Sequence, residues 1–165
     1  MATQTSKKGF QFFPFIISLL IPLAIGFTAS LVTRPEIPGW YAALQKPSFN
    51  PPPWLFAPVW TGLYIMMAIA AYLVWAKRNR AAAFYTATSI YCIQLLLNFS
   101  WSIVFFGMHQ VFWALIIIIL LWVSIVLNMI WFHRFSKTAS WLLVPYLLWV
   151  SFASVLNLYI YLLNG

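Results

Sequence analysis

The sequence predicts an all-α membrane protein, a bundle of five transmembrane helices with a long first loop rich in Pro and Trp. Three observations support this fold class: the 165 residues are 64% hydrophobic and only 6% charged, long stretches carry no charged side chain, and most links between them are short. Such a composition cannot cover a water-soluble surface. The uncharged stretches have the length needed to cross a bilayer. We expect helices at about 10–32, 55–76, 81–106, 111–132 and 139–163 of a single domain, 1–165.

The basic residues predict how the bundle lies in the membrane. Seven of them fall in the N-terminal tail and in the second and fourth connections: Lys7, Lys8, Lys77, Arg78, Arg80, Arg134 and Lys137. The first loop has two, Arg34 and Lys46. Because cytoplasmic loops carry the excess of Lys and Arg, we expect a bacterial inner-membrane protein with its N-terminus in the cytoplasm and its C-terminus outside. Charges divided among short loops do not predict nucleic-acid binding.

The first apolar stretch, preceded by Lys7 and Lys8, also resembles a signal peptide. It is about twice as long as a typical signal-peptide apolar region, which favours a retained helix. The same stretch carries small residues at steps of four: Ser18, Pro22, Gly26 and Ser30. Such a row lets helices approach closely, inside the bundle or against a second subunit.

The first connection, 33–54, is several times longer than the others and is expected to form a ligand lid. From Trp40 to Trp60 the chain combines aromatic rings with a dense series of prolines, and Gly39–Gln45 could form a short helix within it. Prolines fix φ and lower the entropy of the free loop, while flat aromatic rings offer polarizable surface. The segment therefore predicts a stiff aromatic wall over a flat apolar ligand.

Three of the predicted helices carry a stripe of aromatic and polar residues at helical spacing. The stripes are Phe56, Trp60, Tyr64 and Met67; Gln94, Asn98, Trp101 and Phe105; and Pro145, Trp149, Ala153 and Asn157. Amides in hydrocarbon are costly unless they find partners, so these faces should look inward. An alternative is that the amides only bridge helices and that tryptophans form interfacial belts, which we expect for Trp75, Trp131 and Trp141.

Conventional catalytic and metal chemistry is not expected. Glu36 is the only acidic residue, and His109 and His133 lie in connections on opposite sides of the membrane, so no metal site is predicted. A pocket of indoles and amides suits a large planar apolar molecule such as a porphyrin or a sterol. Lys46 or Arg34 near its mouth could meet a carboxylate.

Three separated motifs resemble the TspO/MBR family, the tryptophan-rich sensory proteins related to the mitochondrial translocator protein. They are the segment from Trp40 through Lys46-Pro47, Pro51-Pro52 and Pro58-Val59-Trp60 to Tyr64; Gln94 to Gly107; and Pro145 to Asn157. The likeness runs from about Phe12 to Leu162.

This resemblance implies a five-helix membrane protein, often a homodimer, that binds tetrapyrroles such as protoporphyrin IX and synthetic isoquinoline carboxamides or benzodiazepines. The resemblance also implies that no cofactor is required and that porphyrin is bound as a ligand. Carried over by motif, the ligand-binding residues are Trp40, Pro51, Pro52, Trp60, Tyr64, Asn98, Trp101, Trp149, Ala153 and Asn157. The family's sterol motif is incomplete here, because no basic residue follows Tyr159.

Three functions remain open from the sequence. The first is a membrane receptor or carrier for tetrapyrroles with a sensory or transport role. The second is an enzyme that degrades porphyrin in the light, for which the resemblance offers Trp60 and Trp149 as candidate catalytic residues. The third is a passive scaffold for the transport of lipids or sterols.

Overall fold

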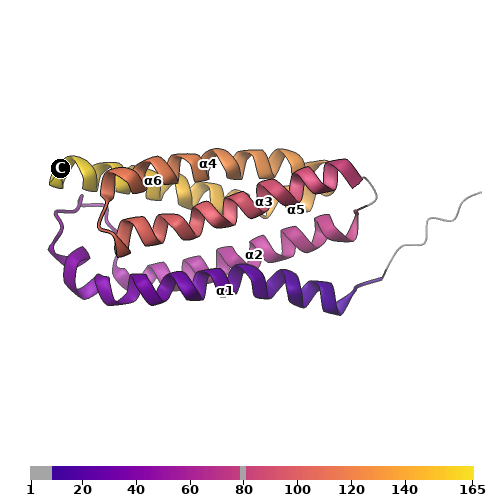
Figure 1. The fold of residues 1–165 in the computed structure, drawn as a ribbon, viewed down its shortest axis with the longest axis horizontal. Helices are drawn as coiled ribbons and strands as arrows, with labels where there is room; N and C mark the ends of the chain where they lie inside the picture. Colours follow the sequence, from indigo (N-terminus) through magenta and orange to yellow (C-terminus); the bar gives the residue numbers. More distant parts are fainter. Residues whose placement is uncertain (1–8, 79–80) are drawn as a thin grey trace, which may run out of the picture.

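The computed structural model describes residues 9–78 and 81–165, which form an elongated bundle of helices running back and forth (Figure 1). In chain order the elements are α1 (Phe12–Glu36), η1 (Ile37–Tyr41), η2 (Pro53–Leu55), α2 (Phe56–Ala76), α3 (Ala81–Ser102), η3 (Ile103–Gly107), α4 (Val111–His133), α5 (Lys137–Trp141) and α6 (Val144–Asn164). Within the described residues, five helical segments are long and apolar enough to cross a membrane. The predicted all-α membrane fold is confirmed.

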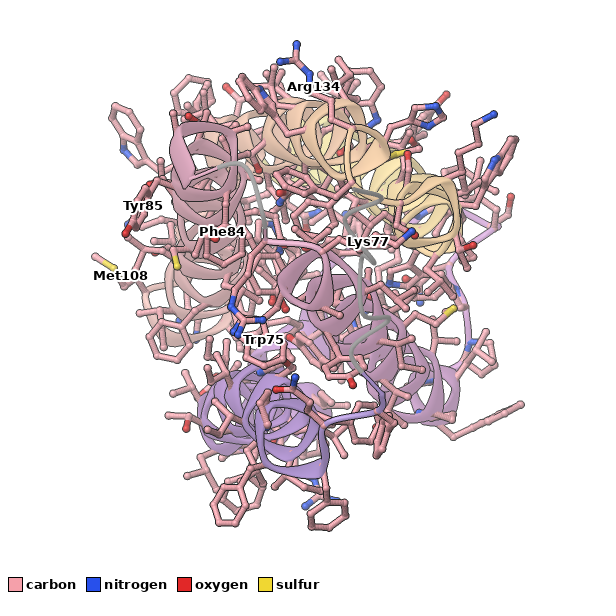
Figure 2. All side chains as sticks on the ribbon, turned by 90° about the vertical axis from the view of Figure 1, so that its right-hand side faces the viewer. Trp75, Lys77, Phe84, Tyr85, Met108 and Arg134 are labelled. Carbon is pink, nitrogen blue, oxygen red and sulfur yellow. The ribbon has the colours of Figure 1, made fainter. Side chains whose placement is uncertain are left out.

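The two ends of the bundle differ in charge and connectivity. The first connection, the α3–α4 link and the C-terminus lie together at one end, here called the loop end, while the α2–α3 and α4–α5 links lie at the other, the basic end (Figure 1). Lys77 and Arg134 belong to the basic end, which faces the viewer in Figure 2. The predicted tail and link residues Lys7, Lys8 and Arg80 lie outside the described residues.

Two tryptophans of the basic end bind arginines as expected of an interfacial belt. The Arg78 guanidinium lies 3.6 Å from the ring centroid of Trp75, and that of Arg134 lies 4.1 Å from the ring centroid of Trp131. These cation–π contacts place a charged group beside an amphipathic ring, the combination typical of a membrane–water boundary.

The first connection is shorter than the expected loop 33–54. Helix α1 continues to Glu36, the wide π turn η1 follows, and helical backbone persists to Ala43. Pro35 and Pro38 remove backbone donors and disturb the regular bonding pattern, and the π turn accommodates this without ending the helix. The short helix expected at Gly39–Gln45 is therefore the end of one long helical segment.

The fifth span differs from the expected single helix 139–163. It consists of α5, whose N-cap Ser136 accepts a hydrogen bond from the Ala139 backbone N–H at 3.4 Å, and α6, which begins at Val144. Pro145 stands in the first turn of α6, where a missing N–H costs nothing, rather than kinking the interior of a longer helix.

The helices pack so that α1 lies on one flank of the bundle. It contacts α2, α3 and η3, while α4 contacts α3 and α6. Met67, Ile125 and Tyr146 are fully buried at the centre. Only a small share of α1 is buried, and its outward Phe and Leu side chains suit contact with lipid. The inner face of α1 therefore packs on α2 and α3 and, at the loop end, on η3.

Candidate ligand-binding site

An aromatic cavity of about 390 Å³, the main cavity, lies among α1, α2, α3 and the turns of the loop end. It is lined by Gly26, Ala29, Ser30, Thr33 and Arg34 of α1, Ile37 and Tyr41 of η1, Pro53 and Trp54 of η2, Phe56, Ala57, Trp60 and Tyr64 of α2, and Trp101, Ser102 and Phe106 of α3 and η3. This volume is within the range of about 300–1,000 Å³ common for small-molecule sites.

A much smaller side chamber of about 30 Å³ adjoins the main cavity. The two share five wall residues, Tyr41, Phe56, Trp60, Trp101 and Phe106. The chamber adds Phe105, Trp149, Ala153, Leu156, Asn157 and Ile160. Movement of the shared aromatic rings would change the shape of both spaces together.

Trp60 and Tyr64 lie one helical turn apart on α2, and their rings stack at 5.7 Å between centroids. The Tyr64 hydroxyl donates a hydrogen bond to Asn98 Oδ1 at 2.7 Å. Asn98 Nδ2 and Gln94 Nε2 both donate to the Tyr146 hydroxyl, at 3.0 and 2.9 Å. These buried polar groups stabilise one another where no water competes, so the Tyr64 ring has a fixed orientation on the cavity wall.

Gly26 explains how α1 comes close enough to complete this wall. A Cβ atom at Gly26 would lie 2.2 Å from a carbon of the Tyr64 ring. Only glycine leaves room for the ring between the two helices. The small residues Pro22, Gly26 and Ser30 thus serve helix packing and wall construction inside the bundle.

Trp101 is oriented by Asn157 of α6, a member of the third aromatic and polar stripe. Its indole N–H donates to Asn157 Oδ1 at 3.0 Å, and Asn157 Nδ2 donates to the Val111 carbonyl at 3.0 Å. The Trp101 ring also stacks on Phe105 at 5.2 Å between centroids. Asn157 therefore fixes an aromatic wall of the cavity and ties α6 to the first turn of α4.

Two π turns, η1 and η3, stand at the loop end and supply Tyr41 and Phe106 to both spaces. A π turn inserts one extra residue per turn and is frequent at functional sites. Gly107 ends η3, and a Cβ there would lie 2.9 Å from Val32 Cγ1. The sequence reasoning gave no indication of these turns, because no composition rule marks them.

The remaining first connection is fastened to the helices. The Tyr41 hydroxyl donates to Asn50 Oδ1 at 2.7 Å, and burial raises the pKa of Tyr41 to about 12. Gln45 and Asn164 exchange two hydrogen bonds of 2.9 Å, which join the loop to the end of α6. These hydrogen bonds hold the first connection in place against the helices at the loop end.

Six of the ten ligand-binding residues expected from the sequence line these spaces. Trp60, Tyr64 and Trp101 line the main cavity; Trp60, Trp101, Trp149, Ala153 and Asn157 line the side chamber. Asn98 lies behind the wall and orients Tyr64.

The other three, Trp40, Pro51 and Pro52, line neither space. The Trp40 ring instead stacks on His109, with 4.2 Å between centroids, and meets the edge of Phe105. The loop side of the main cavity is formed by Pro53 and Trp54, the next residues along the chain.

The sequence reasoning placed Arg34 near the mouth of the pocket but did not include the rest of the α1 wall in the site. A signal was present: Arg34 continues the four-residue steps of Gly26 and Ser30, so all three share a helix face. The row was interpreted mainly as packing, with a polar pathway as the alternative, because small residues have no distinctive chemistry.

Trp149 separates the side chamber from a groove on the outside of the bundle. This groove, about 520 Å³, runs between α2 and α6 and is lined by residues that include Gly62, Pro145 and Phe152. Trp149 lines both spaces, and its buried indole N–H has no hydrogen-bond partner among the described residues. The Trp149 indole that separates the side chamber from the groove is therefore held by side-chain packing and by no hydrogen bond among the described residues.

Comparison with known proteins agrees with this architecture. The profile of the TspO/MBR family matches residues 18–163. Tryptophan-rich protein TspO of Chlorobaculum tepidum is 49% identical over 86% of this chain and 90% of its own length. The Translocator protein of Bos taurus is 37% identical over 84% of this chain and 82% of its own. Tryptophan-rich sensory protein of Cereibacter sphaeroides is 39% identical over 79% and 78%. The chain belongs to the TspO/MBR family of membrane proteins.

Proposed function

We propose that this protein is a membrane receptor or carrier for tetrapyrroles, with protoporphyrin IX as the type of ligand, in a sensory or transport role. The observation that carries the proposal is the main cavity, in which Trp60, Tyr64 and Trp101 from two helices face one space. Flat rings stack favourably on such faces, and the hydrogen-bonded Asn98 and Asn157 hold the rings in place before a ligand arrives.

Titration of protoporphyrin IX against intrinsic Trp emission tests the proposal. Purified protein in neutral detergent should show saturable quenching, and Trp60→Ala should weaken binding by about tenfold, since one stacking face is lost. Trp113→Ala is the matched control, because Trp113 lies on α4 and is largely exposed on the outside of the bundle. Emission that does not change with porphyrin, or equal affinities in all three proteins, would contradict tetrapyrrole binding in this cavity.

Light-dependent breakdown of bound porphyrin is a second candidate, favoured by the position of the oxidisable indoles of Trp60 and Trp101 on the cavity wall. Illumination of the complex should then bleach porphyrin faster in the wild type than in Trp60→Phe. Equal bleaching in both proteins and in free detergent solution would leave binding as the only activity.

We also propose that the basic end faces the cytoplasm of a bacterial cell, which puts the cavity near the outer surface of the inner membrane. The support is the position of Lys77, Arg78, Arg134 and Lys137 at one end of the bundle. Single cysteines placed at Lys77 and at Ser48, in a Cys92→Ser background, should be labelled by an impermeant reagent only at Ser48 in intact cells.

A further inference from the structure

Arg34 is the one charged residue that lines the main cavity; every other residue of that wall is uncharged. It stands on α1 two turns beyond Gly26 and one beyond Ser30, on the face that α1 turns toward α2 and α3. The Ser30 and Thr33 hydroxyls beside it donate to the carbonyls of Phe27 and Ala29 at 2.7 and 3.0 Å. Their hydrogens are thus used within the helix, and Arg34 is the charged donor of this wall.

Lys46, the other cation of the first loop, is engaged elsewhere. Its Nζ donates to the backbone carbonyls of Tyr41, Ala42 and Leu44 at 2.6, 3.1 and 2.8 Å. An ammonium group has three donors, and these contacts use all of them on carbonyls of the last helical turn, Tyr41 and Ala42, and of Leu44 just after it. Lys46 therefore caps the end of the helical segment. Of the two cations that the sequence offered as partners of a ligand carboxylate, this leaves Arg34.

The chain also offers Arg34 no spare acidic side chain. Glu36 is the only Asp or Glu in all 165 residues, and its Oε2 lies 2.9 Å from His109 Nε2. A guanidinium at the edge of an apolar aromatic cavity gains most from an anionic partner, which it binds with two parallel N–H donors.

We propose that Arg34 is the anion-recognising residue of the main cavity. Its guanidinium binds a carboxylate at the rim of a flat ligand, while the apolar ring of that ligand lies against Trp60, Tyr64 and Trp101. This rests on the proposed function and narrows it: the ligand is an aromatic or tetrapyrrole acid, and the uncharged form of the same ring system binds less tightly. A lipid phosphate presents the same oxygen chemistry to Arg34, so the test must separate the two sources.

The test compares protoporphyrin IX, which carries two carboxylates, with its dimethyl ester, which has the same ring and none. Binding of each is followed by Trp quenching in neutral detergent without added lipid, in the wild type, Arg34→Gln and Arg34→Lys. Lys77→Gln is the control, because it removes one positive charge at the opposite, basic end (Figure 2). The wild type and Lys77→Gln should bind the acid about tenfold more tightly than the ester.

Arg34→Gln should lose most of this preference through weaker binding of the acid, with ester affinity unchanged, which also shows that the cavity is intact. Arg34→Lys should keep part of the preference, since it keeps the charge but not the two-donor geometry. An undiminished preference in both Arg34 variants would overturn the proposal.

Three further outcomes would also overturn it. If the wild type has no preference in detergent while Arg34→Gln sheds co-purified phosphatidylglycerol, the anion is a lipid phosphate. If the wild type binds acid and ester equally and no lipid is shed, the role of Arg34 is refuted and tetrapyrrole binding stands. If it binds neither, the proposed function falls with it.

Discussion

The loop end and the basic end of the bundle are built from the same apolar residue types but packed in opposite ways. At the basic end Ala87 and Ala139 are fully buried and leave room for Phe132 and Leu143, which are also almost fully buried. At the loop end the large rings of Trp60 and Trp101 stand partly buried around open space. The interior of the basic half is filled, with an open groove of about 420 Å³ only on its outside between α4, α5 and α6, whereas the loop half encloses the main cavity.

The difference shows how a helical membrane protein can keep open space between its helices. Helices in lipid associate mainly through close packing, so open space must be maintained by something other than apolar contact. Here hydrogen bonds do this: Asn98 orients Tyr64, and Asn157 orients Trp101. The filled half supplies stability, and the hydrogen-bonded rings of the hollow half form the wall of the proposed binding site.

The largest contrast should come from truncating one residue in each half. Leu143→Ala removes a fully buried side chain from the filled half and should lower stability by about 3 kcal/mol. Trp60→Ala enlarges an existing cavity and should cost less stability, while it weakens porphyrin binding by about tenfold. Unfolding in detergent and porphyrin titration of both variants test this. If Leu143→Ala kept full stability but lost porphyrin binding, the separation of stability and binding between the two halves would be contradicted.

A pair of identical glycine substitutions sharpens the comparison. Gly26→Ala places a methyl group against the Tyr64 ring and should cost about 1–3 kcal/mol by overpacking, with weaker porphyrin binding. Gly62→Ala, also in a helix, has open space around the new Cβ and should be neutral or slightly stabilising. Melting temperatures of the two variants measure the difference; equal values would show that α1 does not approach Tyr64 this closely.

The sequence predicted the five spans and part of the wall of the hollow half. Hydropathy and length locate the spans, and helical spacing selects Trp60, Tyr64 and Trp101 because aromatic and amide groups stand out against an aliphatic background. Apart from Arg34, the α1 wall was not predicted, since Gly26 and Ser30 carry no distinctive chemistry. The direction of the Trp40 ring, which stacks on His109 and does not line the cavity, depends on the π turn η1, and no local sequence pattern predicts such a turn.

Asn98→Leu should have a smaller effect than Gly26→Ala or Leu143→Ala. It leaves the Tyr64 hydroxyl without its acceptor and the Tyr146 hydroxyl without one donor, and in a membrane such losses cost about 0.6–1.7 kcal/mol. The measurement is the melting temperature together with porphyrin affinity, which should fall because the Tyr64 ring is no longer oriented. Unchanged affinity would mean that the ring is held by packing alone.

Tyr41 provides the smallest expected effect, a dependence on alkaline pH. Burial raises its pKa from 10.0 to about 12, so above pH 10 the unfolded chain loses this proton before the folded protein does. Stability from this group is complete below pH 10 and declines as the pH rises toward 12. Melting temperatures between pH 9 and 11 should fall more steeply for the wild type than for Tyr41→Phe; parallel curves would show that Tyr41 is not buried.

The most direct test of the central claim is an experimental structure of the protein with protoporphyrin IX bound. The account predicts the tetrapyrrole inside the main cavity, with its ring against Trp60, Tyr64 and Trp101 and with Asn98 and Asn157 still bonded as they are here. A porphyrin located on the lipid-facing surface, with the space between α1 and α2 closed by side chains, would contradict it.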